Sequence, residues 1–176
     1  YSRFSDCKYI LIYQLDAFVF RDELKQWCLK DYDYIGAPWL LKPKYHRFHL
    51  YIFLRIKGLY YYLVNRPFRK LMLGDKIGNG GFSLRKVSSH LRVSIEKEST
   101  INYFLERSNE HSEFNEDVFW GTQNPDFVYP GLREALSFSI DDYPEICFQQ
   151  NQNKLPFGCH GWSKPLKIDF WKDKIN

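Results

Sequence analysis

The chain has 176 residues and a formal net charge of +4, from 25 Lys and Arg against 21 Asp and Glu. This length accommodates one domain with a buried core, and 44% hydrophobic with 26% charged residues excludes a disordered, collagen-like or coiled-coil chain. So mild a charge does not indicate a nucleic-acid partner, and the sequence carries no RRM, KH or helix-turn-helix signature.

The first predicted element is a strand over residues 8–13, KYILIY. Its run of β-branched and aromatic residues is typical of a strand that is buried on both faces, as in a parallel sheet. Asp16 follows at the carboxyl end of this strand. Asp22 is the predicted N-cap of a short helix over residues 22–28, because apolar side chains recur there at spacings of three and four.

Further elements follow in alternation. Residues 32–39, YDYIGAPW, indicate a strand that ends at a glycine and a proline, and residues 78–85, GNGGFSLR, indicate a glycine loop that enters another strand. Apolar residues spaced four apart predict a helix over residues 86–95, and residues 100–106 favour a second one. Strands that alternate with helices predict the α/β class.

The carboxyl-terminal half adds another predicted helix start. Asn115 is a good N-cap, and it places Glu116 and Asp117 in the first helical turn, where the helix dipole favours carboxylates. Residues 132–138 have a mixed pattern, and residues 155–162, LPFGCHGW, form a turn-rich segment. We find no internal repeat and no low-complexity segment.

An unusual basic and aromatic segment interrupts this pattern. Residues 34–74 contain no Asp or Glu, and we interpret about 42–74 as an insertion that projects from the domain as a helix or lid. Residues 42–70 could contact an anionic membrane surface or a phosphorylated acceptor. The simpler alternative is a partly buried helix whose long basic side chains reach past it to water. The basic residues are Lys42, Lys44, Arg47, Arg55, Lys57, Arg66, Arg69 and Lys70.

Four polar features interrupt apolar sequence where loops would leave a sheet: Asp16, residues 78–81, the pair at 116–117, and His160. In open α/β sheets, ligands bind beyond the carboxyl ends of the strands, so these features could meet at one cleft. Each alone has an ordinary explanation as a turn, a cap or a structural histidine. Their order along the chain is the more informative observation.

That order resembles an uncharacterised family of glycosyltransferase-like domains and, more distantly, the beta-1,3-galactosyltransferase and fringe enzymes of GT-A fold. The motifs are DAFVF (16–20), YDYIGAPW (32–39), GNGGFSLR (78–85), EDVFW (116–120) and FGCHGW (157–162). The resemblance covers most of the chain apart from about 40–77 and 96–114. It implies an α/β, GT-A-like mixed sheet flanked by helices, with residues 1–176 as one domain.

The same resemblance implies a site for Mn²⁺ or Mg²⁺. Members of such families carry an Asp-x-Asp motif at the strand end, whereas this chain has Asp16-Ala17-Phe18, with one carboxylate. A metal-binding histidine near the carboxyl end corresponds to His160. Because phosphate and water can complete the coordination of these ions, Asp16 with His160 could suffice, and we expect the two side chains to approach one another.

The remaining site residues also rest on the resemblance. The EDV segment implies that a carboxylate removes the proton of the acceptor hydroxyl, and we favour Asp117 over Glu116 for this role, since the two neighbours point about 100° apart on a helix. The glycine loop implies contact with the donor sugar and the acceptor. The expected donor and acceptor residues are Asn79, Gly80, Gly81, Trp39, Trp162 and Lys164.

The expected function is therefore inverting transfer of a sugar from a nucleotide-diphosphate donor, UDP-linked in the first instance, to a glycan or other hydroxyl acceptor. The metal-motif strand begins by Lys8, so we expect the chain to be the carboxyl-terminal part of a transferase domain that lacks its nucleotide-binding part. The alternative is a non-catalytic carbohydrate-binding module, since 19% of the residues are aromatic. Four separated cysteines predict reduced thiols, and we slightly favour a cytoplasmic or membrane-peripheral location.

Overall fold

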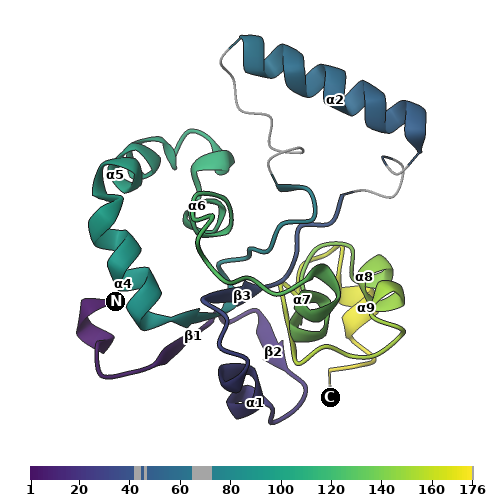
Figure 1. Ribbon diagram of the computed structural model, residues 1–176. Coiled ribbons are helices and arrows are strands. Elements are labelled where there is room, and N and C mark those ends of the chain that lie inside the picture. Colours follow the sequence, from purple (N-terminus) through teal and green to yellow (C-terminus); the bar gives the residue numbers. More distant parts are fainter. Residues whose placement is uncertain (42–44, 46, 65–72, 176) are drawn as a thin grey trace.

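The computed structural model describes residues 1–41, 45, 47–64 and 73–175, and it confirms a mixed α/β architecture. Two small sheets lie at the centre of the molecule (Figure 1). The first contains, in spatial order, β1 (Tyr9–Tyr13), β4 (Phe82–Lys86) and β3 (Tyr34–Gly36). The second contains β2 (Ala17–Val19), β6 (Gly158–His160) and β5 (Ser139–Ile140).

The central strands β4 and β6 bring distant parts of the chain together. Strand β4 is antiparallel to both of its neighbours, while β6 is antiparallel to β2 and parallel to β5. In the second sheet, Ala17 pairs with His160 and Ile140 pairs with Cys159. Residues near 16, 141 and 160 therefore meet at one end of this sheet.

Helices flank the sheets on two sides in Figure 1. One group comprises α4 (Val87–Glu96), α5 (Glu98–Arg107) and α6 (Glu116–Thr122), and the other comprises α7 (Leu132–Phe138), α8 (Pro144–Gln150) and α9 (Ile168–Trp171). Helix α1 (Leu24–Leu29) lies below the sheets in the view. Short 3₁₀ turns are formed by η1 (Ser2–Phe4) and η3 (Ser112–Phe114).

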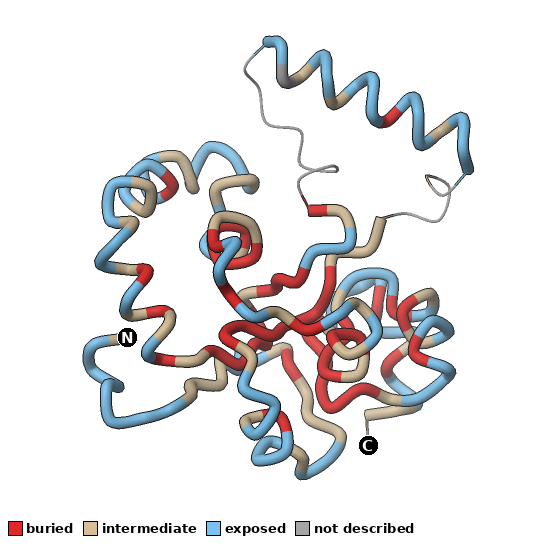
Figure 2. The backbone as a smooth tube through the Cα atoms, viewed as in Figure 1, coloured by how far each residue is buried: buried red, intermediate tan, exposed pale blue. Residues whose placement is uncertain are grey.

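The core is built from the alternation of side chains along the strands. On β3, Tyr34 packs into an aromatic cluster with α5 and α6, whereas Ile35 packs into a second cluster on the opposite face with Phe82 and Leu84 of β4. A third cluster, which includes Trp171, lies under α8 and α9. Figure 2 shows the buried residues gathered along these central strands. The aromatic richness of the sequence is thus used largely for packing.

Several local predictions need correction. Strand β1 is an edge strand that pairs antiparallel with β4, not a strand of a parallel sheet, and none of its residues is fully buried. Helix α1 has Glu23, not Asp22, at its N-cap, and Asn115 holds the N-cap position of α6 without a side-chain capping bond. The turn-rich segment 155–162 contains the short strand β6, because its backbone pairs with β2 and β5.

The predicted insertion contains helix α2 (Phe48–Leu63), which stands apart from the sheets in Figure 1. The expectation of a helix is confirmed over these residues. Residues 42–44, 46 and 65–72 lie outside the described residues, and with them Lys42, Lys44, Arg66, Arg69 and Lys70.

Within the described ranges, no helix combines the length and the apolar character needed to cross a membrane. The cysteines are free thiols, as predicted.

Candidate functional site

The glycine loop before β4 is held by the buried side chain of Asn79. This residue has a φ of 75°, a left-handed conformation that asparagine tolerates better than most residues. Its Oδ1 atom accepts hydrogen bonds from the backbone N–H groups of Gly81 (2.8 Å) and Phe82 (3.3 Å). The loop is therefore fixed in position where the two sheets meet.

His160, the last residue of β6, lies directly against this loop. A Cβ atom on Gly81 would lie 2.0 Å from Nε2 of His160, so only glycine leaves room for the imidazole ring. Nε2 lies 3.1 Å from Oδ1 of Asp16 and 3.0 Å from Oε1 of Gln14. The expected approach of Asp16 and His160 is present, because the β2–β6 register places Ala17 opposite His160.

Asp141 is a member of this cluster that sequence reasoning missed. It follows β5 directly, accepts a hydrogen bond from Nδ2 of Asn79, and lies 3.5 Å from Nδ1 of His160. It also pairs with Lys167, which lies 3.1 Å from Asp142. The only sequence signal was an acidic residue after a two-residue strand, and so short a strand has no distinctive pattern.

Electrostatics favour the charged forms of Asp141 and Lys167. Burial raises the pKa of Asp141, while the hydrogen bond to His160 and the charge of Lys167 lower it. The lowering is larger than the rise, so the pKa of Asp141 lies below its usual range. Burial lowers the pKa of Lys167, while Asp141 and Asp142 raise it, and the net pKa is raised. Asp141 is therefore an anion at neutral pH, aimed at Nδ1 of His160.

The two acidic residues that open α6 have different partners. Glu116 forms a two-pronged ion pair with Arg85, in which Nη2 lies 3.2 Å from Oε2. Arg85 is buried on β4 and also donates to the hydroxyl of Tyr1 at 2.9 Å. Asp117 instead places Oδ2 3.4 Å from the backbone nitrogen of Gly80. Glu116 thus anchors the helix to the sheet, and Asp117 faces the glycine loop.

A continuous line of contacts links the predicted motifs. It runs from Asp117 to the backbone of Gly80 and Gly81, then to the imidazole of His160, and ends at Asp16. Gly80 lies over the first turn of α6, since a Cβ there would be 3.4 Å from Oε2 of Glu116 and 3.5 Å from the Cβ of Asp117. The carboxylate of Asp117 therefore lies on one side of the backbone of Gly80 and Gly81. The polar side chains of His160, Asp16 and Gln14 lie on the other side.

The donor set around His160 fits a hard divalent cation. Without a cation, Nε2–H can donate to Asp16 or Gln14, and Nδ1 can accept from Nδ2 of Asn79 at 3.3 Å. With a cation bound, the imidazole proton would move to Nδ1, which also faces Asp141 at 3.5 Å, and Nε2 would offer its lone pair beside one Asp16 oxygen and the Gln14 amide oxygen. Adjacent ligands of an octahedral ion with bonds of about 2.1 Å lie about 3.0 Å apart, close to the two separations here. In the described part of the chain, no group of three His, Cys, Asp or Glu residues alone could hold a metal, so Gln14, water or a ligand phosphate has to contribute.

The other predicted contact residues lie at both ends of this line. Trp162 donates its backbone N–H to the carbonyl oxygen of Asp16 at 3.3 Å, and Nζ of Lys164 lies 3.7 Å from Oδ2 of Asp16. Trp39 lies at the other end, where a Cβ on Gly78 would be 1.8 Å from its ring. Trp162 and Lys164 thus flank the proposed ligand cluster, and Trp39 supports the start of the loop.

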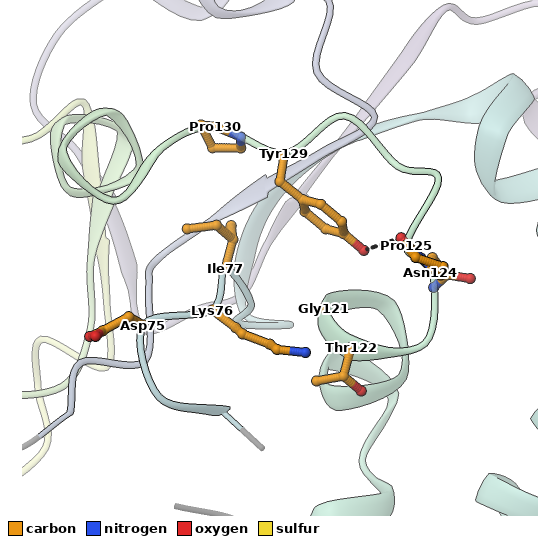
Figure 3. Close-up of a pocket in the computed structure, with 9 residues that line it drawn as sticks. All are labelled: Asp75, Lys76, Ile77, Gly121, Thr122, Asn124, Pro125, Tyr129 and Pro130. Atoms are coloured by element: carbon orange, nitrogen blue, oxygen red, sulfur yellow. Dashed lines mark hydrogen bonds between the residues drawn. The ribbon is translucent and has the colours of Figure 1, made fainter. Parts of the chain in front are cut away.

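A separate cavity of about 370 Å³ is lined by Gly121 and Thr122, at the carboxyl end of α6, and by residues of two other segments (Figure 3). The hydroxyl of Tyr129 donates to the carbonyl oxygen of Asn124 at 3.2 Å on one wall. None of the residues named as its lining is a predicted site residue, so cavity shape and sequence motif point to different places. The lining residues are Asp75, Lys76, Ile77, Gly121, Thr122, Asn124, Pro125, Tyr129 and Pro130.

Comparison with known proteins identifies a family. Residues 1–160 match the family described as "Protein of unknown function (DUF5672)", and the chain therefore belongs to that family. The match includes every predicted site residue through His160, while Trp162 and Lys164 lie beyond it. No curated protein and no solved structure matches the chain.

Proposed function

We propose that this member of the DUF5672 family is a GT-A-like glycosyltransferase that moves a sugar from a nucleotide-diphosphate donor, UDP-linked in the first instance, to an acceptor hydroxyl with inversion. The observation that carries the proposal is the line of contacts from Asp117 through Gly80 and Gly81 to His160 and Asp16. These residues come from four separate segments, and each was selected from the sequence for one part of the same reaction.

Asp117 is the general base in this proposal. Its Oδ1 atom accepts the N–H of Val118 at 2.9 Å, and its Oδ2 atom faces the loop backbone at Gly80. An acceptor hydroxyl beside the loop gives its proton to Asp117 while its oxygen attacks the anomeric carbon. The bond from that carbon to the diphosphate oxygen breaks, and the sugar is inverted. A carboxylate at hydrogen-bonding range contributes about 10²–10⁴ to the rate of such a step.

Asp16, Gln14 and His160 are the proposed ligands of Mn²⁺ or Mg²⁺. The ion would supply positive charge that stabilises the departing diphosphate. Asp141 holds the imidazole of His160 in one orientation through Nδ1, so that Nε2 stays directed at Asp16 and Gln14.

The glycine loop offers backbone rather than side chains to the sugar. Both polar atoms of the Asn79 amide have partners within the protein: Oδ1 accepts from the loop and Nδ2 donates to Asp141. Gly80 and Gly81 have no side chain to exclude a sugar ring. We therefore assign Asn79 to shaping the loop, and the backbone of the two glycines to contact with donor and acceptor.

The direct test measures UDP release from a panel of UDP-sugars by the full-length protein, with a candidate acceptor, in Mn²⁺ and in EDTA. We expect turnover in Mn²⁺ and its loss in EDTA. Asp117→Asn keeps the shape of the side chain and removes its basicity, so kcat should fall by about 10² or more with little change in donor affinity.

Glu116→Gln in the same helical turn is the matched control, and it should lower kcat less. Near-full activity of Asp117→Asn with loss of activity in Glu116→Gln would transfer the base role to Glu116. Full activity of both variants would rule out this segment as the source of the base. Glycan binding without UDP release from any donor would support the non-catalytic carbohydrate-binding alternative.

A further inference from the structure

Helix α2 carries an apolar stripe on its exposed side. The spacings between stripe residues are four, four, three and four, so all of them lie within about 80° of one another around the helix axis. Their side chains are between 40% and 78% exposed. The stripe residues are Phe48, Ile52, Ile56, Leu59 and Leu63.

The opposite side of α2 is the less exposed one. Leu54 is only 2% exposed, and Leu50, Gly58 and Tyr61 are half-buried. These four residues lie on the helix face opposite the stripe. A surface helix of a globular protein normally buries its apolar face and exposes a polar one. Helix α2 has a less exposed face already, and the large apolar residues of the stripe are exposed in addition. Figure 2 shows most of the helix coloured as exposed.

The charged residues of the segment that contains the stripe are all basic. No acidic residue occurs anywhere in the sequence from 34 to 74. Arg55 borders the stripe, and Lys57 lies beside the inner face with its ammonium 5.9 Å from the centre of the Tyr61 ring. The surface therefore matches a partner that is apolar in its interior and negatively charged at its boundary.

The dimensions of α2 favour a helix that lies along a membrane surface. Its 16 residues span about 24 Å, less than the hydrocarbon thickness of about 30 Å. Phe53 and Tyr60 stand exposed beside the stripe, and aromatic rings of this kind favour the membrane–water interface. A second copy of the chain is a poorer partner, because it would bring two acid-free, basic segments together.

We propose that α2 docks the protein onto anionic lipid surfaces, with the stripe residues in the outer part of the bilayer and Arg55, at the edge of the stripe, at the phosphate level. Interfacial helices bind through buried apolar area together with attraction to anionic lipid. This docking is independent of the proposed transfer reaction, because none of the residues assigned to that reaction lies on α2.

The test is flotation of the full-length protein with vesicles of phosphatidylcholine alone or with about 30% phosphatidylserine. The stripe variant carries Ile52→Ser, Ile56→Ser and Leu59→Ser. The control variant makes the same kind of change at Ile95, Leu105 and Leu166, which are 62% to 93% exposed on other elements. We expect the partition coefficient on anionic vesicles to fall at least about ten-fold for the stripe variant and to stay within about two-fold for the control.

A second arm tests the charge component. Arg55→Glu with Lys57→Glu should weaken binding to anionic vesicles, and raising NaCl to about 0.5 M should weaken binding of the unmodified protein. Circular dichroism and thermal unfolding verify that the variants are folded. The proposal is wrong if the unmodified protein does not bind anionic vesicles, or if stripe and control variants lose binding equally. It is also wrong if the stripe variant only converts a dimer to a monomer in light scattering, which would identify a surface for self-association.

Discussion

The junction at the glycine loop and helix α2 depart in opposite ways from the usual distribution of side chains. At the junction, buried cations are paired: Lys167 with the half-buried Asp141, and Arg85 with Glu116, whose own side chain is half exposed. On α2, apolar side chains are exposed. Polar groups that are satisfied inside the protein contribute to its stability, whereas exposed apolar groups can contribute only to binding. Changes in the two regions should therefore be detected by different measurements.

The largest loss of stability is expected at the junction. Asp141→Ala leaves the buried ammonium of Lys167 facing only Asp142 and removes the acceptor of the Asn79 amide. Breaking a buried pair in this way should lower the free energy of unfolding by about 3 kcal/mol in urea denaturation. Asp169→Ala removes an exposed partner of Lys172 and should change it by less than about 0.5 kcal/mol. If Asp141→Ala and Asp169→Ala lowered the free energy of unfolding equally, the paired charges at the junction would contribute no more to stability than an exposed ion pair.

The next effect concerns His90, which is buried among aromatic rings with Nδ1 bonded to the carbonyl oxygen of Lys86. Burial lowers the pKa of His90 to about 3. Below about pH 6.5 the unfolded chain therefore takes up a proton that the folded protein does not, and stability falls as pH decreases. This group alone contributes a slope of about 1.4 kcal/mol per pH unit from about pH 6 to 4.

His90→Phe should remove that contribution. The variant is expected to be less stable than the unmodified protein at pH 7, because the bond to the Lys86 carbonyl is lost. The difference between the two proteins should then shrink toward pH 4, as measured by urea denaturation at each pH. A difference that is constant with pH would show that His90 has the same pKa in the folded and the unfolded chain.

A smaller effect separates the two acidic residues of α6. Glu116→Gln removes the negative charge opposite the buried Arg85, and we expect a loss of about 1 kcal/mol, because Glu116 itself is half exposed. Asp117→Asn should cost less than that, since the amide oxygen keeps the bond from Val118 and only the longer contact with Gly80 is lost. Glu116→Gln should therefore lose more stability, as measured by thermal unfolding. Asp117→Asn should lose more turnover, as measured by UDP release.

The smallest change of stability is expected on α2. Ile56→Ser replaces an exposed apolar side chain and should alter the free energy of unfolding by less than about 0.5 kcal/mol. Leu54→Ser on the inner face of the same helix is the matched contrast and should cost clearly more, because Leu54 is buried. A large loss for Ile56→Ser would mean that the stripe packs within the folded chain.

Local sequence patterns were sufficient for much of the secondary structure. The four-residue apolar spacing after Lys86 predicted α4, and the glycine loop before β4 was placed correctly. The order of the motifs also predicted that Asp16 and His160 would meet, which they do across the β2–β6 pair. The helix and the loop depend on periodicity and on turn-forming residues, which are local properties of a sequence. The approach of Asp16 and His160 was instead implied by the resemblance to the glycosyltransferase-like family.

The choice of partners was decided by the tertiary structure alone. The sequence contains Asp141, Lys167, Gln14 and Arg85, yet nothing local to any of them indicates which side chain it faces. The pairing of β6 with both β2 and β5 brings Asp141 and Asp16 to opposite sides of one imidazole ring. The edge position of β1 is another example, because the sequence of a strand does not show how many strands will pair with it. Periodicity along a chain determines elements, whereas ion pairs and hydrogen bonds depend on distances between segments that only the packed core sets.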